Sequence, residues 1–161
     1  MKDLPYLHIV GPKKSGKTVL MEFLITNLTA RGYRIGSMKH SSHNHPLDKI
    51  GSDSNRFYLA GANPSVFLTP EGMAAFYQPG PNLTIEDLLS RTFSDCDLVL
   101  IESFRQAKGP KILLLKTEDD TKGLENLVAV VNQEGYHPKY PAFKLLDVKL
   151  IDFAMQFMKR R

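Results

Sequence analysis

The segment that most constrains this chain is a run of eight residues, Gly11-Pro12-Lys13-Lys14-Ser15-Gly16-Lys17-Thr18. Its spacing is Gly-x-x-x-x-Gly-Lys-Thr. Glycines let such a loop bend so that its amide N–H groups point inward and surround a phosphate. Apolar residues predict a strand at 6–10, before the loop, and helical spacing predicts a helix at 17–31, after it. The pattern therefore predicts a phosphate-binding loop between a first strand and a first helix.

A nucleoside triphosphate with Mg²⁺ is the ligand that this spacing favours. Lys17 would reach the β- and γ-phosphate oxygens, which makes it a candidate for both binding and catalysis, and Thr18 would place its hydroxyl on Mg²⁺. The positive N-terminal end of the helix adds to the attraction. Lys13 and Lys14 have two interpretations: cations that lean across a phosphate or toward a partner subunit's nucleotide, or solvated loop lysines.

A second candidate group ends an apolar run, Asp97-Leu98-Val99-Leu100-Ile101-Glu102. Such a run is typical of a parallel strand covered on both faces. P-loop enzymes need a carboxylate opposite the loop, to hold Mg²⁺ or its water and to orient the attacking water. Because ligands bind at the carboxyl ends of parallel strands, we expect Glu102 rather than Asp97 to be this metal-side and catalytic carboxylate.

Strands and helices alternate along most of the chain. We further expect strands at 33–38, 98–101, 111–115 and 127–131, helices at 54–60, 84–93 and 148–158, and a hairpin of 65–68 with 73–77. This order predicts an α/β fold of the P-loop NTPase type, a three-layer sandwich with a mainly parallel sheet, helices on both faces and a small β-hairpin. No repeat or long linker divides the sequence, so we expect a single nucleotide-binding domain over residues 1–161.

Charge and composition narrow the classes of function. The chain carries a formal charge of +4, gathered partly around the loop and at residues 159–161, without the aromatic-interleaved basic stripe of a nucleic-acid interface. No apolar run approaches the ~20 residues of a membrane helix. The single cysteine, Cys96, cannot form an internal disulfide and suits a reducing compartment. We therefore expect a cytoplasmic protein that binds neither nucleic acid nor membrane.

The polar segment after the second strand is rich in histidine and leads to an acid and a base: His40, His43, His45, Asp53 and Arg56. Imidazoles and carboxylates can bind Zn²⁺ or Ni²⁺, but the segment lacks cysteine. A solvated loop is one alternative. Another is a switch segment that approaches the triphosphate, with Asp53 as a second carboxylate on the Mg²⁺ side and Arg56 paired with a phosphate or with Glu102. Asp53 is equally consistent with a first-turn acid of the next helix.

Taken in order, these segments resemble the molybdopterin-guanine dinucleotide biosynthesis protein B (MobB) family over nearly the whole chain. The likeness rests on the loop 11–18, Lys39-His40 with His43, Ser52-Asp53-Ser54-Asn55-Arg56, Ala60-Gly61-Ala62, and the run from Asp97 to Arg105 followed by Pro110-Lys111-Ile112. Family members typically have Glu-Gly-aromatic-Lys where this chain has Glu102-Ser103-Phe104-Arg105, and Gly-Lys-Asp-Ser at positions 51–54. Ser103 makes the loop after the strand less flexible.

The resemblance implies a GTP-binding accessory protein of molybdenum cofactor biosynthesis that hydrolyses GTP slowly and is often a homodimer. It would support a separate molybdopterin guanylyltransferase, which attaches GMP to molybdopterin. The residues alone do not indicate guanine, because the Asn-Lys-x-Asp signature of many GTPases is missing. Asn132, which follows the apolar run 127–131, is our candidate for a base contact, although no lysine and aspartate accompany it.

Three other functions remain open from the sequence. A small-molecule kinase uses the same loop, but the seven arginines do not cluster mid-chain as a phosphate-covering lid requires. A metal-delivery GTPase would use the histidine segment, and metal content would distinguish it. An interaction module that holds nucleotide only as a structural ligand would show negligible hydrolysis even with its partner present.

Overall fold

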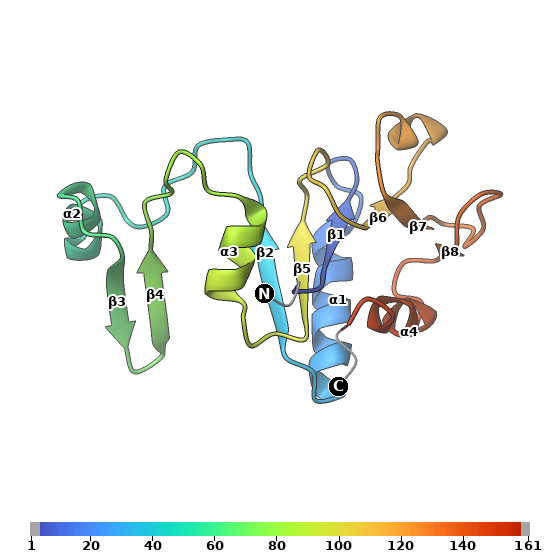
Figure 1. Cartoon of the computed structure of the whole chain (residues 1–161). Helices are drawn as coiled ribbons and strands as arrows, with labels where there is room; N and C mark the ends of the chain where they lie inside the picture. The colour runs from blue at the N-terminus through green and yellow to red at the C-terminus, as the bar shows by residue number, and fades with distance from the viewer. Residues whose placement is uncertain (1–3, 159–161) are drawn as a thin grey trace. The chain divides into compact units, whose positions relative to one another are not determined.

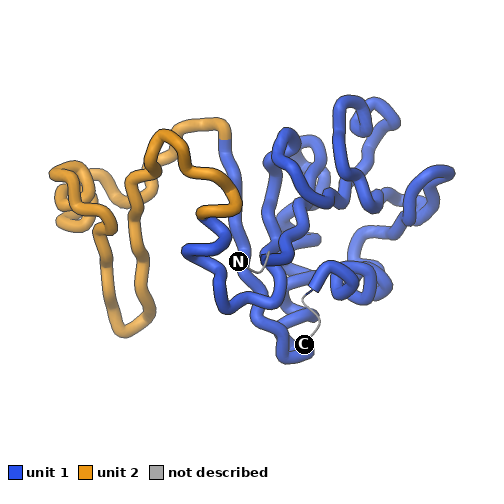
Figure 2. The backbone as a smooth tube through the Cα atoms, viewed as in Figure 1, with its two compact units in different colours: residues 1–41, 88–161 blue, residues 42–87 orange. Residues whose placement is uncertain are grey.

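The computed structural model describes residues 4–158, and the chain divides into two compact units. Unit 1 comprises residues 1–41 and 88–161, and unit 2 comprises residues 42–87 (Figure 2). The basic residues 159–161 lie outside the described part. The single nucleotide-binding domain over residues 1–161 stays a prediction beside this division.

Unit 1 is built on a six-stranded sheet with the order β2-β5-β1-β6-β7-β8 (Figure 1). Its strands are β1 (Tyr6–Val10), β2 (Ile35–Lys39), β5 (Leu98–Glu102), β6 (Lys111–Leu114), β7 (Leu127–Val131) and β8 (Ala142–Phe143). All neighbouring strands pair in parallel. The carboxyl ends of β1 and β5 therefore lie side by side at one edge of the sheet, where parallel sheets bind ligands.

The two faces of this sheet are covered differently. On one face, alternate apolar residues of the strands pack against α1 (Lys17–Ala30) and α4 (Lys149–Met155) in a fully buried core. Leu20, Leu24 and Leu28 supply the α1 side, at the helical spacing expected from the sequence. The opposite face carries two buried polar residues, His8 and Lys111. The loop between β5 and β6 lies over these polar residues, as described below.

Unit 2 contains α2 (Asp53–Leu59) and a two-stranded antiparallel hairpin of β3 (Ser65–Thr69) and β4 (Gly72–Phe76). Ser52 caps α2 by accepting the amide of Asn55 at 3.2 Å. The helix α3 (Ile85–Thr92) spans the boundary between the units. It begins with a capping contact, in which the Asp87 amide donates to Thr84 Oγ1 at 3.1 Å.

The predicted fold class is confirmed: a mainly parallel α/β sheet with helices and a small hairpin. Predicted elements agree with the structure to within a few residues. The sequence patterns did not predict β8 or a short 3₁₀ helix at Glu118–Thr121, here called η1. Elements of two to four residues are too short to show a periodic pattern. Within residues 4–158, the structure has no helix of the length and hydropathy that crossing a membrane requires.

Candidate functional site

The loop between β1 and α1 bends tightly because of its glycines. A Cβ on Gly11 would lie 2.8 Å from Ser15 Oγ and 2.9 Å from the Leu114 carbonyl oxygen, so a side chain there would force the loop or β6 to move. Gly16 has a φ of +97°, in the left-handed region that disfavours side chains, and it caps α1 directly. The first turn of α1 leaves amide N–H groups without intrahelical partners, which is the setting for phosphate binding.

The Lys17 side chain turns back over this loop. Its Nζ donates to the carbonyl oxygens of the loop's first two residues, at 3.0 and 2.7 Å. Burial lowers the pKa of Lys17, an effect that the Glu102 carboxylate opposes and the ammonium groups of Lys39 and Lys116 reinforce. Lys17 thus has two cations and one carboxylate near it, and the excess positive charge suits a polyanion.

Glu102 lies beside the loop because of the strand register. β1 and β5 pair Ile9 with Glu102, so the last residue of β5 stands level with the end of β1. Thr18 Oγ1 donates to Glu102 Oε2 at 3.5 Å, and Lys39 Nζ lies 4.0 Å from Oε1. The Glu102 side chain is 13% exposed. The structure therefore brings together the hydroxyl and the carboxylate that the sequence assigned to Mg²⁺.

The loop after Glu102 has unusual backbone angles. Ser103 and Phe104 have φ values of +74° and +69°, and the left-handed conformation costs an ordinary residue about 1–2 kcal/mol. The Phe104 ring stacks on His40 at 3.9 Å and meets the ring of His8 edge-on at 6.3 Å. The fully buried His8 contacts the Lys108 carbonyl through Nε2 at 3.1 Å. These contacts hold the loop against the sheet.

Lys111 anchors the same loop from the sheet below. Its side chain is fully buried, and its Nζ donates to the carbonyl oxygens of Ala107, Gly109 and Glu125. Burial lowers the pKa of Lys111. A buried ammonium needs such partners because an unpaired one would be strongly disfavoured. The lysine that the sequence showed after Pro110 thus has a structural role.

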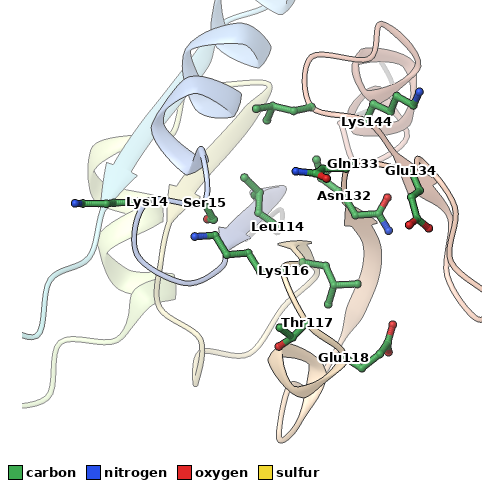
Figure 3. Close-up of a pocket in the computed structure, with 13 residues that line it drawn as sticks. Lys14, Ser15, Leu114, Lys116, Thr117, Glu118, Asn132, Gln133, Glu134 and Lys144 are labelled. Atoms are coloured by element: carbon green, nitrogen blue, oxygen red, sulfur yellow. The ribbon is translucent and has the colours of Figure 1, made fainter.

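A cavity of about 820 Å³ opens beside the phosphate-binding loop (Figure 3). Its lining comprises Lys14, Ser15, Leu114, Leu115, Lys116, Thr117, Glu118, Val131, Asn132, Gln133, Glu134, Lys144 and Leu145. Ser15 Oγ is buried and makes no hydrogen bond within the described residues. A hydroxyl left unpaired at the loop fits a phosphate oxygen, since buried polar atoms ordinarily have partners.

Asn132 lines this cavity, but its amide is used in a turn. Its Nδ2 donates to the Tyr136 carbonyl at 2.8 Å, and its Oδ1 accepts the Gly135 amide at 2.7 Å. The base contact assigned to Asn132 stays a prediction. Sequence reasoning missed the cavity residues Lys116 and Glu118. Their sequence signal is a Lys-x-Glu spacing directly after the apolar run 111–115.

Asp97 and Arg105 serve the fold. Asp97 Oδ2 accepts a hydrogen bond from the backbone amide of Arg34, just before β2, at 2.8 Å. Arg105 donates to the Asp120 carbonyl at 2.8 Å and so ties the loop after β5 to η1.

The histidine segment and Asp53 fall mainly in unit 2. Asp53 is the first residue of α2, and its carboxylate lies 3.7 Å from Arg56. His43 and His45 meet edge-on at 6.4 Å, whereas His40 stacks on Phe104 in unit 1. Within the described residues, no three His, Cys, Asp or Glu side chains gather as metal ligands. The Mg²⁺ role of Asp53 stays a prediction.

The strand order, with a glycine-flanked loop after β1 and an acidic end on the adjacent β5, places this chain in the P-loop NTPase fold class. Comparison with known families makes the assignment narrower. The family model for molybdopterin guanine dinucleotide synthesis protein B matches residues 6–133, and the chain belongs to this MobB family.

Individual relatives of the chain carry names that agree with this family assignment. A molybdopterin-guanine dinucleotide biosynthesis adapter protein of Haemophilus influenzae is 40% identical over 118 residues, which cover 72% of this chain and 66% of that protein. The Escherichia coli adapter protein is 29% identical over 167 residues, or 98% of this chain and 95% of its own length. The crystal structure of Bacillus subtilis MobB matches with a TM-score of 0.77 at 24% identity, covering 98% of this chain and 99% of that one, which shows a common fold.

His8 gives the fold a defined pH dependence. Burial lowers the pKa of His8 below 6.5, and its hydrogen bond to Lys108 only partly offsets this. Below pH ~6.5 the unfolded chain therefore binds a proton that the folded chain resists, so the free energy of unfolding decreases as the pH falls, by at most about 1.4 kcal/mol per pH unit. His8→Gln, which keeps a donor but does not titrate, should lose less stability than the parent in urea unfolding between pH 7.5 and 5.5. Equal losses would contradict this account.

Proposed function

We propose that this chain is a GTP-binding accessory protein, with slow GTPase activity, that supports formation of molybdopterin guanine dinucleotide in molybdenum cofactor biosynthesis. The observation that carries the proposal is the meeting of Lys17, Thr18 and Glu102 at the end of β1, beside the unpaired hydroxyl of Ser15. The relatives are named adapter proteins of this biosynthesis, which supports an accessory role.

Each residue has a distinct role in this proposal. Residues 11–16 and the N-terminus of α1 hold the phosphates through backbone amides, and Lys17 neutralises their charge. Thr18 and Glu102 offer the oxygen ligands that Mg²⁺ prefers. Bound there, Mg²⁺ would supply further charge neutralisation of the phosphates. Glu102 orients the attacking water, directly or through the metal's water shell.

The accessory role implies a partner. We propose a molybdopterin guanylyltransferase as that partner, in the cytoplasm, with the chain acting as a homodimer. Unit 2 carries large exposed apolar side chains: Leu47, Ile50, Phe57, Leu59, Val66, Phe67, Leu68 and Met73. Exposed apolar side chains gathered in so small a unit are typical of an interaction surface. Leu68 and Met73 are direct neighbours across the hairpin and are 74% and 70% exposed.

Lys17→Ala tests the phosphate site. Removing the ammonium should weaken GTP binding by about 3 kcal/mol, or roughly a hundredfold in Kd, since charge-assisted contacts are worth about that much. Isothermal titration calorimetry with GTP and Mg²⁺ measures the change, and unchanged unfolding in urea controls for folding. If Lys17→Ala binds GTP as tightly as the parent, the phosphate site is not at this loop.

Glu102→Gln separates hydrolysis from binding. The amide keeps the size of the side chain but loses the charge that orients water, so the single-turnover rate of GTP hydrolysis should fall about tenfold or more while the Kd for GTP changes little. The rate is measured at saturating GTP with Mg²⁺. A variant that hydrolyses GTP at the parent rate would remove Glu102 from the mechanism.

Leu68→Lys tests the homodimer. Sedimentation equilibrium should give the parent about twice the 18.1 kDa chain mass, whereas a charge within an apolar contact should shift the variant toward the monomer. Glu71→Gln, at the hairpin tip, changes the charge by the same one unit and should remain dimeric. A monomeric parent would refute the homodimer.

A further inference from the structure

The cavity beside the phosphate-binding loop extends from that loop to the segments that follow two strands of the sheet. It begins at Lys14 and Ser15 and reaches the residues that follow β6 and β7 (Figure 3). Its volume of about 820 Å³ lies in the range of small-ligand sites. A triphosphate held in the loop can therefore direct its base toward the ends of these two strands.

Lys116 joins the two parts of the cavity. Its Nζ donates to the Lys13 carbonyl at 3.3 Å, and Figure 3 shows its side chain pointing toward the phosphate loop. The backbone amides of Lys116 and Thr117 donate to Asp120 Oδ2 at 2.9 and 3.0 Å. This bonding fixes the turn that opens η1, and it places the next residue, Glu118, on the cavity wall.

Glu118 faces a buried histidine. The His137 side chain is 3% exposed, and its Nδ1 accepts the Lys139 amide at 3.1 Å, so in the neutral ring the proton is on Nε2. That Nε2 lies 3.5 Å from Glu118 Oε2 and makes no hydrogen bond within the described residues. The Glu118 side chain is 73% exposed. A buried imidazole nitrogen thus lies within ion-pair distance of a carboxylate that remains open to a ligand.

A carboxylate in this place distinguishes nucleobases by their hydrogen-bonding edges. Ionised carboxylates only accept hydrogen bonds. Guanine presents two adjacent donors, N1–H and the 2-amino group, whereas adenine presents an acceptor at N1. Xanthine has a carbonyl in place of the 2-amino group, and hypoxanthine lacks that group. We propose that Glu118, with His137 as its positioning residue, reads the N1–H and 2-amino group of guanine. This inference rests on the proposed nucleotide site and adds the group that selects its base.

The cavity contains one rival to Glu118. Glu134, after β7, is the other carboxylate of the lining. Asn132 lies nearby, but its amide already bonds within its own turn. The geometry favours Glu118 because a buried imidazole nitrogen lies 3.5 Å from its carboxylate and because its turn is tied to the phosphate-binding loop through Lys116.

The test compares four ligands by calorimetry with Mg²⁺: GTP, ATP, XTP and ITP. The parent should bind GTP about tenfold or more tightly than the other three, because a site built to accept two hydrogen bonds disfavours a base that lacks one or both donors. Glu118→Gln should lose about tenfold in GTP affinity and gain XTP affinity, since an amide can donate to the xanthine carbonyl. Asp119→Asn, which removes the same charge from the next residue of η1, should keep the parent's order of affinities.

His137 and the phosphates are tested separately. His137→Phe should lower the ratio of GTP to XTP affinity while binding of inorganic tripolyphosphate stays at the parent value, a result that general loss of structure would not give. The role of Glu118 would be overturned if Glu134→Gln, rather than Glu118→Gln, lowered the ratio of GTP to XTP affinity. Equal affinities of the parent for GTP and ATP would also overturn it. Both results would leave the phosphate site intact. Loss of all triphosphate and tripolyphosphate binding in the parent would overturn the proposed function as well.

Discussion

The candidate site depends on the parallel pairing of β1 with β5. Ile9 lies opposite Glu102, so the carboxylate at the end of one strand stands beside the glycine-flanked loop at the end of the other. A shift of one residue would send the Glu102 side chain to the other face of the sheet, because strand side chains alternate. The fully buried apolar residues of β5 and β1 hold that register, so the packing that stabilises the core also sets the geometry of the site.

Behind the site, buried polar groups fix the loop that follows Glu102. His8 and Lys111 occupy positions on the sheet where apolar residues are usual, and both bond to carbonyl oxygens of that loop. Their desolvation is unfavourable, which is the cause of their lowered pKa values. The φ of Ser103 is +74°, in the left-handed region that favours glycine. The chain keeps a strained serine in place through these surrounding contacts.

The fold was predictable from the sequence, and so was the position of the glycine-flanked loop between β1 and α1. Long apolar runs predict β5 and β7, and the spacing of Gly11, Gly16 and Lys17 predicts a tight loop before a helix. The proposed contact of Glu118 could not be predicted, because Glu118 lies in a four-residue 3₁₀ helix and His137, 3.5 Å from its carboxylate, comes from a distant loop. Contacts between segments far apart along the chain leave no local pattern. The division into two units was also unforeseen, since the polar segment that begins unit 2 was expected to be a loop within a single domain.

A crystal structure grown with Mg²⁺ and a non-hydrolysable GTP analogue tests the central claim most directly. The account predicts the β-phosphate within hydrogen-bonding distance of the amides of residues 11–16 and of Lys17 Nζ. It also predicts the metal between Thr18 and Glu102, with at most a water between the metal and the carboxylate. An analogue bound outside this loop, or a loop whose amides point away from the phosphates, would contradict it.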